Sequence, residues 1–172
     1  MRDLYMDILI KLPAIIHDLH SRLIHAVHQV QTTEHDLAVS FPDWRNELGE
    51  FGMIFRLFGS NQQILETYRS YVAALVDHDL IRLFPILPVP QTDRKVCFAR
   101  DQDGKKAGPA ALRRRIRRGA TTDMTLSAPR PNTHWLQALS SGGHQFQLVI
   151  RKTTSERQGG HGYGLGLLVP EF

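Results

Sequence analysis

Two repeating patterns of apolar residues alternate along the first 90 positions, and their order restricts the folds open to the chain. Ser60 and Gln63 have the spacing of a capping box, so Ser60 is the expected N-cap of a helix that ends near Asp77. A longer helical pattern begins at Pro13 and ends near Gln31. Apolar residues alternate or form short runs, as in β-strands, in four segments: Leu4–Ile10, Asp36–Phe41, Phe51–Phe58 and Leu80–Val89. The resulting order, β-α-β-β-α-β, predicts a ferredoxin-like domain of the α+β class.

The remaining residues predict a second, smaller domain. Pro88–Arg94 is the expected linker, which places the boundary between residues 1–90 and residues 91–172. Lys95–Arg100 and Gln145–Lys152 alternate as strands do, whereas Gly119–His134 shows neither period and is expected to be an irregular connection. We therefore expect a smaller C-terminal domain that mixes helix and strand.

Charge is distributed unequally between these two predicted domains. Residues 1–90 hold 7 Lys and Arg against 11 Asp and Glu, a net charge of −4, whereas residues 91–172 hold 14 against 6, a net charge of +8. Five arginines surround one isoleucine in "ALRRRIRRGA", Ala111–Ala120. As a helix, this run places Leu112 and Ile116 one turn apart as an apolar stripe, with the like charges around it. An anionic partner such as a nucleic acid would relieve their repulsion, and a solvated charged surface is the alternative.

Cysteine and apolar content argue against a secreted or membrane protein. Cys97 is the only cysteine, so neither an intrachain disulfide nor a cluster of metal-binding thiolates can form. The N-terminal segment carries Asp7 where a signal peptide would be apolar. No apolar run approaches the roughly 18 residues of a membrane span. We expect a cytoplasmic protein without membrane association.

Four histidines fall on the first predicted helix, and they have different expected roles. The helix contains no His-Glu-x-x-His pattern, and Asp18 is the only acid near its histidines, so a zinc site is the weaker hypothesis. For His17, His20 and His25 a polar helix surface is the favoured interpretation. His28 lies on the solvent side near the end of the helix, where an imidazole that titrates near neutral pH can act as a general base.

Several short motifs, in order along nearly the whole chain, resemble the repeat-processing endoribonuclease of type I-F CRISPR systems. They are "VHQ", "VSFPDW", "VCFARDQ", "LRRRIRR", "SSGGHQFQLVIR" and the terminal "YGLG" followed by "VPEF". The resemblance implies an N-terminal ferredoxin-like domain and a C-terminal domain with an arginine-rich helix. This division agrees with the one obtained from periodicity and charge.

The resemblance also implies the catalytic residues. His28, in "VHQ", matches the catalytic histidine of the family, and Tyr163, in "YGLG", matches its supporting tyrosine. The family has a serine that anchors the 2′-hydroxyl, and here the chain departs from the pattern. Counting back from the stacking aromatic without a gap leads to Ser141, and a shift of one residue leads to Ser140.

The implied RNA-binding residues are more numerous. Arg100 and Gln102 match a pair that reads base edges, for which arginine suits guanine and glutamine suits adenine. Phe146 matches the aromatic that stacks below the closing base pair of the hairpin stem. The arginine-rich helix would enter the major groove near the end of the stem, with three of its residues in contact with RNA: Arg114, Arg115 and Arg118.

By this resemblance the chain is a metal-independent endoribonuclease without a cofactor. It would cleave precursor CRISPR RNA at the 3′ base of the repeat hairpin by attack of a 2′-hydroxyl, leaving a 2′,3′-cyclic phosphate. It would be monomeric when free, keep its product, and join the other subunits of the type I-F surveillance complex. The altered serine segment favours an alternative, a non-catalytic hairpin-binding subunit. A metal-dependent nuclease built on the histidines is a weaker third hypothesis.

Overall fold

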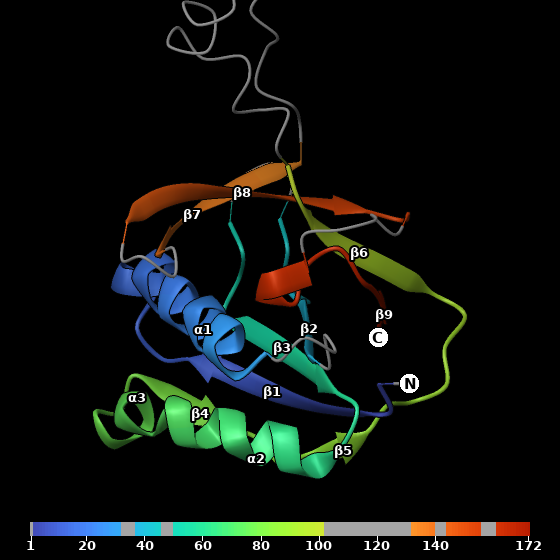
Figure 1. Ribbon diagram of the computed structural model, residues 1–172, viewed down its shortest axis with the longest axis horizontal. Coiled ribbons are helices and arrows are strands. Elements are labelled where there is room, and N and C mark those ends of the chain that lie inside the picture. Colours follow the sequence, from blue (N-terminus) through green and yellow to red (C-terminus); the bar gives the residue numbers. More distant parts are fainter. Residues whose placement is uncertain (1, 32–36, 46–49, 102–131, 140–143, 156–160) are drawn as a thin grey trace, which may run out of the picture.

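Two antiparallel sheets organise the part of the chain that the computed structural model describes, which is residues 2–31, 37–45, 50–101, 132–139, 144–155 and 161–172 (Figure 1). The first sheet has the strand order β2-β3-β1-β4, and β5 pairs with β1. The second has the order β7-β8-β6-β9. The strands of the first sheet are β1 (Leu4–Ile10), β2 (Leu37–Ser40), β3 (Ile54–Gly59), β4 (Ile81–Leu83) and β5 (Leu87–Pro88). Those of the second are β6 (Lys95–Arg100), β7 (Thr133–Leu139), β8 (Gln145–Thr153) and β9 (Leu168–Pro170).

The helices connect the strands of the first sheet and approach the second. A 3-10 turn, η1, leads into α1, and α2 is followed directly by α3. In Figure 1, β7 and β8 lie at the top of the view, α2 and α3 lie at the bottom, and α1 lies between these two levels. No helix in the described ranges is long and apolar enough to span a membrane. The bounds are η1 (Pro13–Ile15), α1 (Ile16–Val30), α2 (Gln62–Tyr71), α3 (Ala73–Asp77) and a second 3-10 turn, η3 (His161–Tyr163).

The ferredoxin-like order predicted from periodicity is confirmed, with local differences. Asn61, and not Ser60, is the N-cap of α2, because the Asn61 side-chain oxygen accepts a hydrogen bond from the backbone N–H of Ile64 at 3.0 Å. The second helical pattern divides at Val72 into α2 and α3. The fourth predicted strand divides into β4 and β5 around Pro85, which has no N–H for a sheet ladder.

The prediction for Gly119–His134 is wrong at its C-terminal end, because β7 begins at Thr133. This strand pairs with β8 over its whole length, and its buried side chains alternate with exposed ones. The buried positions are His134, Leu136 and Ala138. A histidine and an alanine at two of the three buried positions make the alternation weak in the sequence.

In the described residues, one hydrophobic core joins α1 and α2 to both sheets. On β1, Met6, Ile8 and Ile10 are fully buried, as the period of two requires. Buried side chains of both sheets belong to the same cluster. Phe41, just after β2, packs edge-to-face on Phe98 of β6 with 5.1 Å between ring centroids. The shared core therefore holds α1 and the C-terminal segment in a fixed relation.

Candidate active site

Four of the predicted site residues converge from four different elements. His28 lies on the last turn of α1 and Tyr163 at the end of η3, and their rings stack with 4.5 Å between centroids and 24° between planes. Phe146, near the start of β8, meets Tyr163 at 6.2 Å between centroids. The guanidinium carbon of Arg100, at the end of β6, lies 5.2 Å from the Phe146 ring centroid. Residues more than a hundred positions apart in the sequence thus form one continuous group.

The imidazole of His28 is held in a defined tautomer. Nδ1 lies 2.8 Å from the carbonyl oxygen of Gly162. A carbonyl oxygen can only accept a hydrogen bond, so Nδ1 carries the proton and donates it to this contact. In the neutral ring Nε2 then has the free lone pair, and it is the nitrogen that can accept a proton. His28 is partly buried, not on an open solvent surface as the sequence suggested.

Tyr163 is the buried member of this group. The residue is 8% exposed, and burial raises the pKa of its phenol above the ordinary value, with the nearby Arg100 charge acting in the opposite direction. The phenol is therefore neutral at physiological pH.

Gly164 fixes the segment that carries Tyr163. Its φ is +68°, a backbone conformation that glycine adopts without a steric penalty. A Cβ at this position would lie 3.1 Å from a methyl group of Val27 on α1 and 3.1 Å from one of Val39 on β2. The Gly164 carbonyl oxygen accepts a hydrogen bond from the Val39 N–H at 3.0 Å. The close approach locks the 162–164 segment between α1 and β2, which sets the position of the Gly162 carbonyl.

The other predicted site residues lie outside the described residues. They are Gln102, Arg114, Arg115, Arg118, Ser140 and Ser141. The arginine-rich helix as a whole belongs to this part of the chain.

The histidines of α1 do not form one polar surface, so that expectation is wrong for His20. His20 is fully buried among phenylalanines, and its Nε2 donates a hydrogen bond to the Gly52 carbonyl oxygen at 2.9 Å. Burial lowers the pKa of His20 to about 4. His17 is exposed and His25 is half-buried. Within the described ranges, no three His, Cys, Asp or Glu side chains are grouped so that they could hold a metal ion.

Sequence reasoning missed two features of the site. The Gly162 carbonyl that orients His28 gives no sequence signal, because every residue has a carbonyl oxygen. The second feature is a hollow of about 230 Å³ beside the site, between α1 and the β7–β8 hairpin. Its lining residues are Asp18, Ser21, Arg22, His25, Gln137 and Gln145. Helical spacing aligns the first four on one side of α1, but only the unpredicted strand β7 brings Gln137 to them.

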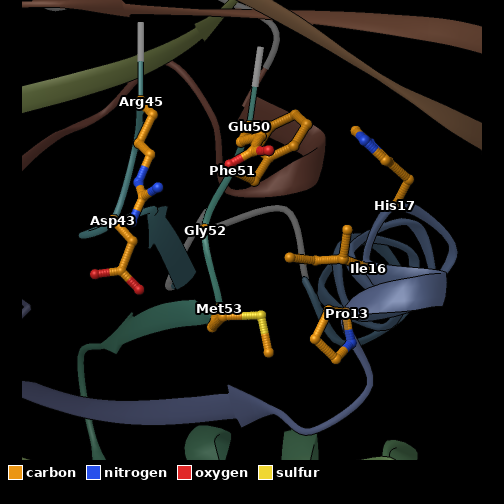
Figure 2. Close-up of a pocket in the computed structure, with 9 residues that line it drawn as sticks. All are labelled: Pro13, Ile16, His17, Asp43, Arg45, Glu50, Phe51, Gly52 and Met53. Carbon is orange, nitrogen blue, oxygen red and sulfur yellow. The ribbon is translucent and has the colours of Figure 1, made fainter. Parts of the chain in front are cut away.

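A second cavity, of about 270 Å³, lies at the start of α1 (Figure 2). Pro13, Ile16 and Met53 form an apolar wall, while charged side chains from the segment between β2 and β3 occupy the opposite side. His17 stands at its edge. About 17 Å of helix separates His17 from His28, so this cavity is distinct from the candidate active site.

The comparison with protein-family models agrees with the resemblance in the motifs. A family model described as "CRISPR-associated protein (Cas_Csy4)" matches residues 4–172. No curated protein matches the sequence. Among solved structures, one titled "CRISPR associated protein Cas6" aligns over 96% of this chain and 97% of its own, with 10% sequence identity and a TM-score of 0.35.

Proposed function

The chain belongs to the Csy4 family of CRISPR-associated proteins, the type I-F endoribonucleases that process CRISPR repeat RNA, and we propose that it cleaves this RNA without a metal ion. In this proposal the cut falls at the 3′ base of the repeat hairpin. The observation that carries it is the hydrogen bond from His28 Nδ1 to the Gly162 carbonyl, which leaves Nε2 as the basic nitrogen.

The reaction needs one proton acceptor and correct alignment of the attacking group. His28 Nε2 takes the proton of the 2′-hydroxyl that precedes the scissile phosphate, and the 2′-oxygen attacks phosphorus. The bond from phosphorus to the 5′-oxygen of the next nucleotide breaks, and that oxygen takes up a proton from solvent. The products are a 2′,3′-cyclic phosphate and a 5′-hydroxyl. A positioned general base typically contributes about 10²–10⁴ in rate, and alignment of the reacting groups contributes further.

The surroundings of His28 suit this role. The His28 ring stacks on Tyr163 and donates a hydrogen bond to the Gly162 carbonyl oxygen, so the orientation of the ring is set before RNA binds. Arg100 brings positive charge close to Phe146, where the sugar-phosphate backbone at the base of the stem would pass. Ser140 or Ser141 would hold the 2′-hydroxyl, as the family resemblance implies.

RNA recognition is assigned to the second half of the chain. Phe146 is partly exposed at the start of β8 and would stack below the last base pair of the stem, a contact worth about 1–3 kcal/mol. Arg100 and Gln102 would read base edges near this pair. The arginine run would supply phosphate contacts in the groove of the stem. We further propose that the monomeric protein keeps the cleaved hairpin and carries it into the surveillance complex.

Two RNA substrates test the proposal directly. The protein is incubated with a repeat hairpin in excess chelator, and in parallel with the same RNA carrying a 2′-deoxy nucleotide before the scissile phosphate. We expect cleavage of the first RNA to a 2′,3′-cyclic phosphate and none of the second. Cleavage of the deoxy RNA would exclude 2′-hydroxyl attack, loss of cleavage in chelator would favour the metal-dependent hypothesis, and binding without cleavage would favour the non-catalytic subunit.

A further inference from the structure

The hollow between α1 and the β7–β8 hairpin lies next to His28 of the candidate active site. His25 is part of its lining, and the His25 and His28 rings lie 6.5 Å apart between centroids. Gln145, also in the lining, precedes Phe146 in β8, and side chains one residue apart in a strand lie on opposite faces of the sheet. The hollow is therefore reached from His28 along α1, past His25, and an RNA strand that leaves His28 in this direction meets it next.

An exposed tryptophan lies farther along the same surface. Trp135 on β7 is 54% exposed, the largest exposed fraction among the large apolar side chains of the described residues. Its ring stacks on His17 with 6.3 Å between centroids and 20° between planes. Strand pairing places Trp135 on the same face of the sheet as Gln137 and Gln145, since Gln145 pairs with Leu139 and residues two apart share a face.

These side chains form a continuous row beside α1. The row begins at His25, passes the Asp18–Arg22 pair and ends at His17. His17 lies about 17 Å along the helix axis from His28. Arg22 Nε donates to the Asp18 carboxylate at 2.8 Å, which offsets charge in the middle of the row. We call the whole surface the α1–β7 track: His17, Asp18, Ser21, Arg22, His25, Trp135, Gln137 and Gln145.

We propose that the α1–β7 track binds the unpaired nucleotides that follow the scissile phosphate, with one base stacked on Trp135. This inference rests on the proposed function, because the cleaved strand must continue past His28. Its chemistry fits single-stranded RNA better than a duplex. Amide side chains can pair with base edges, and an exposed indole offers a stacking surface that any base can use. The near-neutral middle of the track disfavours a binding mode based on phosphate contacts alone.

The stem and the flank then occupy different parts of the protein. Phe146 and the basic C-terminal half hold the hairpin, while the track holds the 3′ flank and keeps the scissile bond extended across His28. Before cleavage the flank adds affinity. After cleavage it is a separate short strand, which the track holds far more weakly than the hairpin is held.

Binding of RNA that cannot be cleaved separates this inference from the proposed function. The substrates are a 2′-deoxy-blocked repeat hairpin without flanks, the same hairpin with four unpaired 3′ nucleotides, and one with four unpaired 5′ nucleotides. The proteins are the parent, Trp135→Ala, Trp135→Phe, and Tyr71→Ala as a control at an aromatic residue that is 53% exposed on α2. Dissociation constants are measured at one fixed salt concentration.

We expect the 3′ flank to tighten binding of the parent. Trp135→Ala should weaken binding of the 3′-flanked RNA by about fivefold or more, as loss of one stacked base predicts, and leave the bare hairpin within twofold. Trp135→Phe should recover part of this affinity, and Tyr71→Ala should change neither. An equal loss on flanked and bare RNA, no gain from the 3′ flank, or a gain from the 5′ flank alone would overturn the inference. Cleavage of unblocked RNA by the same proteins reports separately on the proposed function.

Discussion

The substitution Gly164→Ala tests whether the segment carrying Tyr163 is wedged between α1 and β2. Two costs follow from the structure. Alanine at φ +68° pays about 1–2 kcal/mol for a left-handed conformation. Its Cβ would also lie 3.1 Å from methyl groups of Val27 and Val39 and 3.4 Å from the Ala38 backbone, an overpacking that typically costs about 1–3 kcal/mol.

Together these costs predict that Gly164→Ala lowers the free energy of unfolding by about 2–5 kcal/mol. For a chain of this length the melting temperature should fall by about 4–20 °C. A shift of Tyr163 and of the Gly162 carbonyl should also slow cleavage by about 10–100-fold at a temperature where the variant is folded, since displacements near 1 Å have effects of this size.

Gly162→Ala is the matched control. A Cβ at Gly162 would lie 3.6 Å from His28 Nδ1, which is an ordinary contact. Its stability should change by less than about 1 kcal/mol in either direction. Thermal unfolding and single-turnover cleavage of both variants are measured together. Equal melting temperatures and equal rates for the two variants would refute the reasoning that Gly164 fixes the site.

Three further predictions concern stability and recognition. Asp7→Ala should lower the free energy of unfolding by about 3–5 kcal/mol in urea titrations, because the Asp7 carboxylate accepts two hydrogen bonds from Arg56, which is only 8% exposed. Asp18→Ala removes an exposed ion pair with Arg22 and should lower it by less than about 1 kcal/mol. Burial holds the pKa of His20 at about 4 in the folded protein, against 6.5 in the unfolded chain. The contribution of neutral His20 to the free energy of unfolding is therefore complete above about pH 6.5 and is lost as the pH falls toward 4. Between pH 7 and pH 5 the loss is about 2 kcal/mol, and His20→Gln should flatten the pH dependence of urea unfolding by that amount; an unchanged dependence would contradict the assignment. Arg100→Ala should weaken hairpin binding by about 1–3 kcal/mol and relax the preference at one base pair near the stem base, and a loss equal for all hairpin sequences would indicate a phosphate contact instead.

The sequence predicted the fold best where apolar periodicity is strong. β1 has three fully buried positions at a spacing of two, and its predicted and observed bounds coincide. β7 was missed, because His134 and Ala138 occupy buried positions that a hydrophobicity pattern does not recognise. The predicted N-cap of α2 was one residue too early, because Ser60 and Asn61 are both good capping residues and only the backbone geometry selects Asn61.

The site was predictable only in part, for a physical reason. The family resemblance implied His28 and Tyr163, but their stacking depends on a turn closed by Gly164 against two other elements. The Gly162 contact that sets the tautomer of His28 is a backbone interaction and has no signature in residue type. His20 shows the opposite error, since a histidine at helical spacing gives no sign that phenylalanines will surround it.

The most direct test of the central claim compares cleavage and binding for His28→Ala, with His78→Ala as a control at an exposed histidine after α3. Single-turnover cleavage of a repeat hairpin in chelator and affinity for its 2′-deoxy form are measured for each variant. We predict that His28→Ala slows cleavage by at least about a hundredfold while affinity stays within a few fold, and that His78→Ala changes neither. Cleavage by His28→Ala at the parent rate, or a loss of affinity as large as the loss of rate, would contradict the account of His28 as the general base.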